Sequence, residues 1–361
     1  MDELSGQTLH QRYQIQSQLS RKVGRRTFLA IDLQTDMLVV IKLLIFNQDF
    51  DWQDLKLFER EAETLKSIEH PAIPRYLDYF EFDLPEYRGF ALVQDYINAK
   101  SLDLALSKGR RWSEDDVRQI AQALLKILEY LHSQNPPIVH RDIKPSNILI
   151  TNRSSHHVGD IYLVDFGSVQ NLGHRDGSTM TIVGTYGYMP PEQFGGKAFP
   201  SSDLYSLGAT LIYLVTGNHP ADLTGDDGKI HFKSDHISKG LIDWLEYLTQ
   251  PTIDRRFKNV SDAQILIGTR YIPPLSVNQP LTLISSRVIN EGIPNLGIIG
   301  LMANTLLAFC LTATVMISVI YFVVSFTLVT HAMFSGSSLL FIFFCTLFLF
   351  SWFLTQFTKN N

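Results

Sequence analysis

The chain has 361 residues, enough for about two domains, and 45% of them are hydrophobic, which can supply a large buried core. The formal net charge is −5, so the overall charge does not indicate binding to nucleic acid. Its two cysteines, Cys310 and Cys345, lie in apolar surroundings and give neither a disulfide framework nor metal-ligand spacing. The N-terminus has two early acids and no apolar core, so it is not a secretory signal, and we expect the first part of the chain to stay in the cytoplasm.

The first hundred residues are rich in stretches typical of β-strands. Residues 12–20, 26–32 and 38–46 contain many strand-forming residues and are separated by turn-prone ones. Residues 55–70 place apolar side chains at helical spacing and predict a helix, and residues 90–97 return to a strand pattern.

Two long helices are predicted further along the chain. Residues 113–134 form a strongly amphipathic pattern with Ser113 as the expected N-cap. Residues 203–217 are nearly all apolar and stop at Gly217, as a buried central helix would. Strands with one helix first, and mostly helices afterwards, predict a two-lobed α+β domain.

The C-terminal part of the chain has a different character, because no Asp, Glu, Lys or Arg occurs between Glu291 and Lys359. Residues 304–330 are long enough to cross a bilayer, and residues 339–357 are a second candidate span after the polar break 331–338. A buried core helix is rarely so long and so free of charge, so we favour a two-span transmembrane helical hairpin. One long span followed by a re-entrant segment is the alternative.

The residues around the two spans predict their orientation. Positive charges flank the pair at Arg287 and Lys359, and the loop between the spans has none, which favours both ends on the inner side. Residues 272–296 mix Pro, Gly, Ser and Asn without a clear period, and we interpret them as a juxtamembrane linker. We therefore expect a multi-pass membrane protein that contacts membrane lipid through its spans and keeps its globular part in the cytoplasm.

The stretch VHRDIKPSNILI (residues 139–150) carries the decisive chemistry. It combines a carboxylate at Asp142, an ammonium at Lys144 and an amide at Asn147 between apolar stretches. Phosphoryl transfer needs such groups: an acid to orient an attacking hydroxyl, a cation for the moving phosphoryl group and an oxygen ligand for Mg²⁺. Asp165 ends a second apolar stretch, IYLVD, where it is poised as another Mg²⁺ ligand.

Further motifs occur in order around these two. Lys42 ends the apolar run VVIK, where a buried ammonium needs a partner, and Glu61 on the following helix is the expected one. The segment GTYGYMPPEQ (residues 184–193) completes the set of motifs. With this set, the chain resembles the eukaryotic-type protein kinases, whose H-R-D-x-x-x-x-N, D-F-G and A-P-E signatures occur here as HRDIKPSN, DFG and PPE. The resemblance extends over about residues 13–268. The residues within these motifs are typical of the serine/threonine branch and are similar to those of cyanobacterial kinases.

The resemblance implies a domain organisation. It predicts the bilobal kinase fold over residues 13–271, with a small β-rich N-lobe and a larger helical C-lobe. The proposed segments are a tail at residues 1–12, an N-lobe at about 13–95, a C-lobe at about 98–271, the linker at 272–296 and the two spans.

The resemblance also implies roles in catalysis. Asp142 would accept or orient the proton of the substrate hydroxyl, and Lys144 would neutralise the transferring phosphoryl group. Thr185 would hydrogen-bond near both of them, and Asn147 and Asp165 would hold Mg²⁺. The implied substrates are ATP and a protein with Ser or Thr acceptors.

For the nucleotide, the resemblance implies that Lys42, paired with Glu61, positions the α- and β-phosphates. Asp95 and Ile97 would offer backbone groups to adenine. Val40, in place of the usual alanine of V-A-I-K, would narrow the adenine pocket slightly.

The phosphate-covering loop departs from the family pattern. In LSRKVGRRTFLA (residues 19–30), the slots of G-x-G-x-x-G-x-V are taken by Ser20, Lys22, Arg25 and Thr27, and only Gly24 is a glycine. One account is that a side-chain cation, from Lys22, Arg25 or Arg26, contacts the phosphates in place of backbone amides. The other is weak nucleotide binding, which would make the protein a membrane-bound pseudokinase scaffold. We favour an active kinase because every ionisable and metal-binding position is intact.

Two structural roles and a regulatory one follow from the resemblance. Arg256 would pair with Glu192 to brace the C-lobe, and Asp203 would anchor the catalytic loop from the central helix. Arg141 precedes Asp142, and kinases with that arginine often need a phosphorylated activation loop. The candidate acceptors are Ser178, Thr179 and Thr181.

Overall fold

The computed structural model describes residues 4–46, 50–151, 157–172 and 183–267. The chain divides into two compact units, residues Met1–Val288 and Ile289–Asn361, and all described residues belong to the first. Within these described ranges, no helix is both long enough and apolar enough to cross a bilayer. The predicted spans 304–330 and 339–357, the linker 272–296 and the three candidate phosphoacceptors lie outside the described residues.

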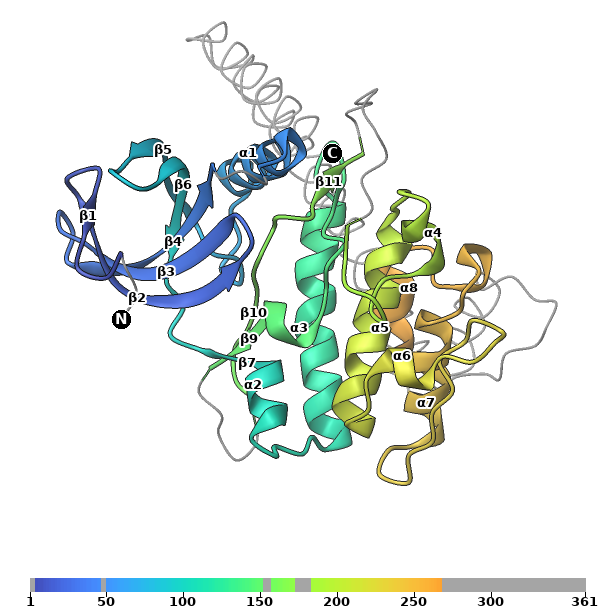
Figure 1. Cartoon of the computed structure of the whole chain (residues 1–361). Helices are drawn as coiled ribbons and strands as arrows, with labels where there is room; N and C mark the ends of the chain where they lie inside the picture. Colours follow the sequence, from blue (N-terminus) through green and yellow to red (C-terminus); the bar gives the residue numbers. More distant parts are fainter. Residues whose placement is uncertain (1–3, 47–49, 152–156, 173–182, 268–361) are drawn as a thin grey trace, which may run out of the picture. The chain divides into compact units, whose positions relative to one another are not determined.

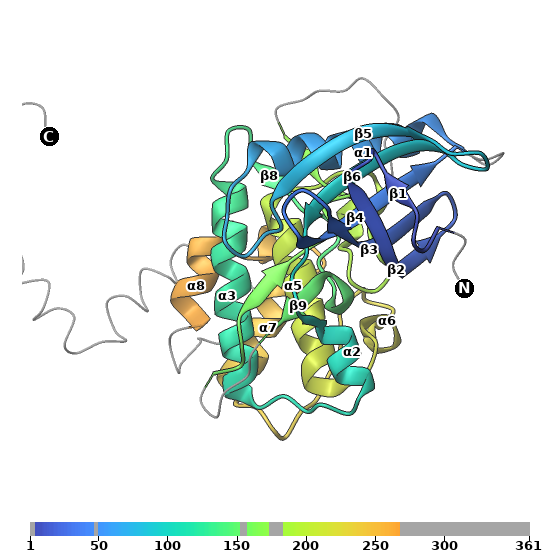
Figure 2. The same ribbon diagram turned by 90° about the vertical axis from the view of Figure 1, so that its left-hand side faces the viewer.

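A six-stranded sheet with one long helix forms the N-lobe, at one end of the described unit in both views (Figures 1 and 2). The strands run in the order β1-β2-β3-β4-β6-β5, and all neighbours are antiparallel. The helix α1 (Trp52–Ser67) connects β4 to β5 and begins where the Asp51 side chain accepts a hydrogen bond from the Gln53 N–H. The strands are β1 (Thr8–Leu9), β2 (Tyr13–Lys22), β3 (Arg25–Asp32), β4 (Met37–Ile45), β5 (Tyr76–Asp83) and β6 (Arg88–Asp95).

The N-terminal segment packs on this sheet. Leu4 and Leu9 are both 1% exposed and belong to the same hydrophobic cluster as Phe28 and Ile41 of the strands. β1 pairs with the start of β2. Part of the predicted tail 1–12 is therefore joined to the N-lobe, because its isolated leucines bury on one face of the sheet without forming a recognisable sequence pattern.

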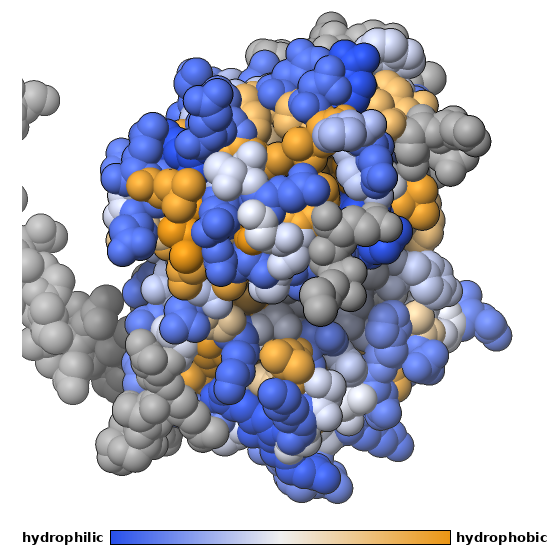
Figure 3. Space-filling view, turned by 60° about the vertical axis from the view of Figure 1, so that its left-hand side comes forward, coloured by the Kyte–Doolittle hydropathy of each residue, from blue (hydrophilic) through white to orange (hydrophobic). Residues whose placement is uncertain are grey.

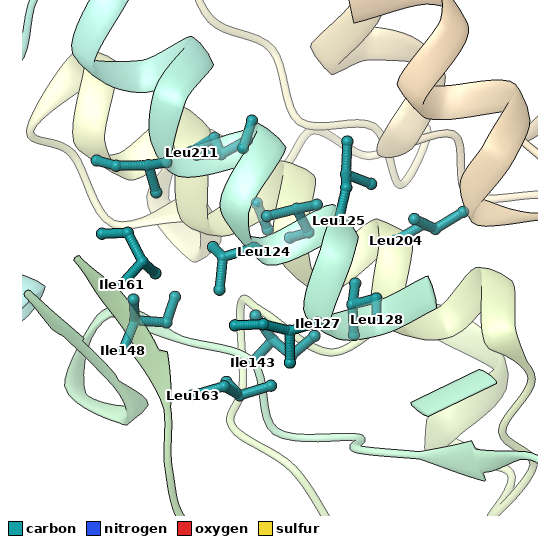
Figure 4. Close-up of a cluster of buried hydrophobic side chains, with 14 of the residues drawn as sticks. Leu124, Leu125, Ile127, Leu128, Ile143, Ile148, Ile161, Leu163, Leu204 and Leu211 are labelled. Atoms are coloured by element: carbon teal, nitrogen blue, oxygen red, sulfur yellow. The ribbon is translucent and has the colours of Figure 1, made fainter. Parts of the chain in front are cut away.

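The C-lobe is built around two buried helices, α3 and α5, which lie side by side in both ribbon views (Figures 1 and 2). Their apolar faces meet side chains from short strands and from the catalytic loop, as Figure 4 shows for Leu124, Leu128, Ile143, Ile161 and Leu211. The helices are α2 (Leu102–Ser107), α3 (Glu114–His132), α4 (Pro191–Phe194), α5 (Pro200–Thr216), α6 (Pro220–Leu223), α7 (Lys239–Leu248) and α8 (Val260–Ile267), with 3₁₀ turns η1 (Pro145–Asn147) and η2 (Ile253–Arg255).

Two small sheets position the catalytic loop. One has the order β10-β9-β7 and the other pairs β11 with β8, all antiparallel. The strands are β7 (Lys100–Ser101), β8 (Ile138–Val139), β9 (Ile148–Ile150), β10 (Ile161–Leu163) and β11 (Gln170–Asn171). The loop of Asp142 therefore runs between β8 and β9, and Asp165 follows β10.

The predicted helices occur with shifted ends. The pattern at 55–70 became α1 at 52–67, because Asp51 caps it earlier and Ile68 has extended backbone. α3 begins after Ser113, which forms the predicted cap, with its side chain accepting from the Asp116 N–H and Asp116 accepting in return. α5 starts three residues earlier than predicted and ends at Gly217, whose φ of 70° is the left-handed conformation that glycine favours.

The surface of the N-lobe side is mostly hydrophilic. Figure 3 shows hydrophobic side chains in separate groups among polar ones. The buried hydrophobic side chains form two clusters, one on the N-lobe sheet and one that runs from α1 through the C-lobe. The predicted two-lobed α+β arrangement is present in the described residues.

Candidate active site

The catalytic loop brings its functional side chains into one hydrogen-bonded network. Thr185 donates from Oγ1 to Asp142 Oδ1 at 2.7 Å. Lys144 donates from Nζ to Asp142 Oδ2 at 2.8 Å and to Thr185 Oγ1 at 2.6 Å. Both oxygens of the Asp142 carboxylate are thus fixed, by an ammonium on one side and a hydroxyl on the other.

Asn147 joins the same network from the turn η1. Its Nδ2 donates to the backbone oxygen of Asp142 at 2.9 Å and to Asp142 Oδ2 at 3.1 Å. These bonds fix the orientation of the amide and leave Oδ1 as an acceptor on its other side. Asn147 is 5% exposed, so the geometry is set by packing as well as by hydrogen bonds.

Asp203, in the first turn of α5, holds the backbone of the loop. Its carboxylate accepts hydrogen bonds from the N–H groups of His140 and Arg141, each at 2.9 Å, and from His132 Nε2 at 2.9 Å. Asp203 is completely buried. The anchoring contact predicted for it is present. His132 was missed, because nothing in its sequence context distinguishes it from an ordinary last-turn residue of α3.

His140 is a packing residue in this geometry. It is completely buried, and its ring meets that of Phe166 edge-on at a centroid distance of 4.9 Å. Burial lowers the pKa of its imidazole, which favours the neutral form.

Lys42, Glu61 and Asp165 form a charged cluster between the lobes, in which Glu61 is buried and Lys42 and Asp165 are partly exposed. Lys42 Nζ donates to Glu61 Oε1 and to Asp165 Oδ1, the latter at 2.8 Å. Burial alone would lower the pKa of Lys42, but the two carboxylates outweigh it and raise that pKa. The Lys42 charge in turn lowers the pKa of Asp165, whereas burial raises the pKa of Glu61.

The backbone around these groups is strained. Asp165 has φ of 68° and Arg141 has φ of 67°, values that non-glycine residues rarely adopt. Such conformations persist only where surrounding contacts impose them, and they gather at functional sites. Here Asp203 fixes the Arg141 N–H and Lys42 fixes the Asp165 carboxylate.

The register of the N-lobe sheet gathers the predicted nucleotide residues on one face. Thr27 lies opposite Lys42 and Ser20 opposite Thr27, and directly opposite residues share a face. Lys22 lies opposite Arg25 on the same hairpin. Val40, two residues before Lys42 in β4, is on this face too.

The tip of the β2–β3 hairpin is a two-residue turn of Val23 and Gly24. Gly24 has φ of 68°, so the single glycine stands where the turn needs left-handed backbone. A Cβ at this position would come no closer than 3.9 Å to any atom, so conformation and not space selects glycine.

The structure separates the three cations considered for phosphate contact. Arg25 Nη2 donates to Asp54 of α1, at 3.1 Å to Oδ1 and 3.2 Å to the backbone oxygen. Arg26 is 8% exposed, with its guanidinium 4.6 Å from the centre of the Tyr87 ring. Lys22 is exposed, and after Lys42 its charge also lowers the pKa of Asp165. Of the three, Lys22 is the one whose side chain is exposed.

The two residues predicted to contact adenine lie at the end of β6, where Asp95 is the last residue of the strand and Ile97 comes two residues later. The Asp95 N–H donates to the Arg75 oxygen at 3.1 Å, and the Asp95 carboxylate accepts from Arg75 Nε at 2.6 Å. The Ile97 oxygen accepts from the Ala99 N–H at 2.8 Å. These bonds leave the Asp95 carbonyl and the Ile97 N–H as the backbone groups for adenine under the predicted roles.

Arg141 contacts the segment after Asp165. Its guanidinium donates to the backbone oxygens of Ser168 and Val169 and to Gln170 Oε1, the last at 3.2 Å. Burial lowers its pKa to about 10. Arg141 thus holds the start of the activation segment.

The PPEQ segment is tied to both the catalytic loop and the C-lobe. Glu192 accepts two hydrogen bonds from Arg256, at 2.7 and 2.8 Å, which is the predicted pair. Gln193 was missed: its Nε2 donates to the oxygens of Arg141 at 2.7 Å and Val183 at 2.6 Å. The only feature of the sequence that could have indicated this contact is that a polar residue directly follows the PPE motif.

The oxygen donors suit Mg²⁺. Asn147 offers an amide oxygen whose orientation is fixed by the Nδ2 bonds, and Asp165 offers a carboxylate held ionised by Lys42. Amide and carboxylate oxygens are the ligands that Mg²⁺ takes together with substrate phosphates. The residues present therefore fit a magnesium ion.

Comparison with known proteins identifies the family of the chain. Residues 18–267 match the family described as "Protein kinase domain". The chain is similar to "Serine/threonine-protein kinase D" of Synechocystis sp. (37% identical over 244 residues, 63% of this chain and 45% of that protein) and to "Serine/threonine-protein kinase PknA" of Nostoc sp. (38% over 230 residues, 60% and 39%). A third relative is "Serine/threonine-protein kinase B" of Synechocystis sp. (33% over 226 residues, 60% and 35%). The chain thus spans less than half the length of these relatives. It belongs to the protein kinase family and is similar to the eukaryotic-type serine/threonine kinases of cyanobacteria.

Proposed function

We propose that the protein is an active serine/threonine protein kinase that transfers the γ-phosphoryl group of ATP to Ser or Thr hydroxyls of proteins. The observation that carries this proposal is the complete network around Asp142, in which Lys144, Thr185 and Asn147 all hold one carboxylate. Such a network is the arrangement that an acceptor hydroxyl and a transferring phosphoryl group require.

In the proposed reaction, the Asp142 carboxylate orients the substrate hydroxyl and receives its proton. The hydroxyl oxygen forms a bond to the γ-phosphorus while the bond to the β–γ bridging oxygen breaks, which releases ADP. Lys144, fixed between Asp142 and Thr185, places its positive charge beside the transferring group. Mg²⁺, when bound, would neutralise the phosphate charge.

The N-lobe residues would position ATP. Lys42, oriented by Glu61, reaches the α- and β-phosphates, and Lys22 adds a cation from the hairpin. The backbone groups of Asp95 and Ile97 bind adenine, and Val40 packs on its ring. The register that puts Lys22, Val40 and Lys42 on one sheet face supports this arrangement.

We further propose that the kinase is anchored in a membrane by residues 304–330 and 339–357, with its catalytic domain in the cytoplasm. The support is the absence of Asp, Glu, Lys and Arg between Glu291 and Lys359. Fractionation with alkaline carbonate tests this proposal. Release of the full chain into the soluble fraction would contradict it.

A pseudokinase scaffold is the second candidate. It is favoured by the hairpin, where Ser20, Lys22 and Arg25 carry side chains at positions that glycines occupy in the family pattern. A Cβ there keeps backbone amides away from phosphates. Intact Lys42 and Asp165 favour the enzyme.

The test is magnesium-dependent transfer of labelled γ-phosphate from ATP by the full chain, to itself and to a generic basic protein. The matched control is Asp142→Asn, which keeps the shape of the side chain but removes its charge. We expect transfer by the native protein and a loss of about 1,000-fold in the control. No transfer by folded native protein that still binds ATP would favour the scaffold.

A further inference from the structure

Arg25 occupies the position where the family pattern has its third glycine, and it does not extend into solvent. From β3 it reaches the first turn of α1 and donates to both the side chain and the backbone oxygen of Asp54. The β2–β3 hairpin, referred to below as the phosphate-loop hairpin, is thereby linked directly to the helix that carries Glu61. A glycine at this position could make neither contact.

The other branch of the Arg25 guanidinium faces the charged cluster. A Cβ built on Gly167 would lie 3.1 Å from Glu61 Oε2, 3.4 Å from Arg25 Nη1 and 3.5 Å from Asp165 Oδ1. Three charged groups from β3, α1 and the segment after β10 therefore meet around one α-carbon. The Arg25 charge also lowers the pKa of Glu61, after burial, which raises it, and the larger effect of Lys42.

The charges of the cluster suggest what the contact between Arg25 and α1 does. Within the cluster, the single ammonium of Lys42 faces the carboxylates of Glu61 and Asp165, which leaves one negative charge in excess. Arg25 adds a second cation at its edge. Arg25 is also paired with Asp54, so it brings no net charge, but its Nη1 lies beside the Glu61 and Asp165 carboxylates and attracts both, which favours the arrangement with α1 drawn inward.

We propose that Arg25 is a positioning residue that holds α1 against the hairpin and keeps Glu61 within reach of Lys42 before nucleotide binds. Where the family pattern has a glycine with a flexible backbone, Arg25 instead links the β2–β3 hairpin to α1. For its consequence in catalysis, the inference rests on the proposed kinase function.

The first measurement is hydrogen exchange of the α1 amides in the nucleotide-free full chain, which needs no activity. The variants are Arg25→Ala, Asp54→Ala and the double variant. Arg21→Ala is the matched control, because it removes a cation from the same hairpin. We expect exchange in α1 about 3- to 5-fold faster in Arg25→Ala and unchanged in the control.

Asp54 also stabilises the start of α1 through the helix dipole, so the double variant isolates the pair. With the link present, Asp54→Ala accelerates exchange less in the Arg25→Ala background than in the native one. Additive effects of the two substitutions would overturn the proposal.

The second measurement separates positioning from direct phosphate binding. Under the proposal, Arg25→Ala lowers kcat about 5-fold and changes the KM for ATP little. A raised KM with native exchange in α1 would overturn it, because Arg25 would then act on phosphate. If the native protein transfers no phosphate, the proposed function is wrong, but hydrogen exchange in α1 still shows whether Arg25 holds the helix.

Discussion

The catalytic loop (residues 139–150) and the phosphate-loop hairpin (residues 18–27) reach their geometry in opposite ways. In the loop, Asp142 is held by Lys144 and Asn147, which lie within the same short motif. In the hairpin, Arg25 finds its partner on α1, 29 residues away. The motif letters therefore identify two of the groups that hold Asp142, whereas in the hairpin they do not indicate the partner of Arg25, which lies outside the motif.

The largest expected effect comes from removing the anchor of the catalytic loop. Asp203→Ala leaves the N–H groups of His140 and Arg141 buried without their acceptor. We expect a loss of about 3–5 kcal/mol in the free energy of unfolding and of about 100-fold in transfer rate. Denaturant unfolding and transfer assays measure both. The control is Asp222→Ala, which removes an exposed first-turn carboxylate from α6. If Asp203→Ala had an effect as small as that of Asp222→Ala, Asp203 would not be the anchor of the catalytic loop.

A second prediction tests how closely the hairpin and the cluster pack. Gly167→Ala introduces a Cβ 3.1 Å from Glu61 Oε2, so the Glu61 carboxylate must shift by a few tenths of an ångström, and the new Cβ also touches Arg25 and Asp165. We expect kcat to fall about 10-fold, measured at saturating ATP. The control is Gly195→Ala, where the new Cβ would come no closer than 3.4 Å, to a single backbone oxygen. Native kcat in Gly167→Ala would show that the cluster is loose.

A third prediction assigns the phosphate cation of the hairpin. Lys22→Ala should raise the KM for ATP about 5-fold, because a charge-assisted contact to phosphate is lost. The increase should shrink at high salt, since Lys22 is exposed. Arg21→Ala, one residue away, should leave KM unchanged. Equal effects of the two substitutions would indicate a diffuse field instead of a contact.

The smallest expected effect on transfer lies at the base of the same hairpin. Arg12 donates to Asp32 Oδ1 at 2.8 Å and to Oδ2 at 2.7 Å, and this pair lowers the pKa of Asp32. A lowered pKa stabilises the fold above the ordinary value of 3.8, and that stability is lost as the pH falls further. Asp32→Asn should therefore cost about 1 kcal/mol at pH 7.

The difference in unfolding free energy between the native protein and Asp32→Asn should shrink as the pH falls below the ordinary pKa of Asp32. Transfer rates at pH 7 should be equal. A stability difference that stays constant with pH would show that the ion pair contributes nothing.

The resemblance to the kinase family predicted the contacts of the catalytic loop and its anchor. Lys144 and Asn147 share one short motif with Asp142, whereas Thr185 lies 43 residues from Asp142 and Asp203 lies 62 residues from Arg141, so only the ordered set of family motifs could place these two. Lys42 and Glu61 could be paired since a buried ammonium requires a carboxylate. The contact of Gln193 with the Arg141 oxygen could not be predicted, because it joins a side chain to a backbone group 52 residues away. The burial of Leu4 was missed because a single leucine has no period.

The most direct test of the account restores the family pattern in the hairpin. The full chain with Ser20→Gly, Lys22→Gly and Arg25→Gly would be compared with native protein in ATP affinity and kcat, with Ser20→Gly alone as the control for added flexibility. Our account predicts weaker ATP binding and slower transfer in the triple variant, because the phosphate cation and the link to α1 are both lost. Tighter ATP binding and faster transfer would contradict it.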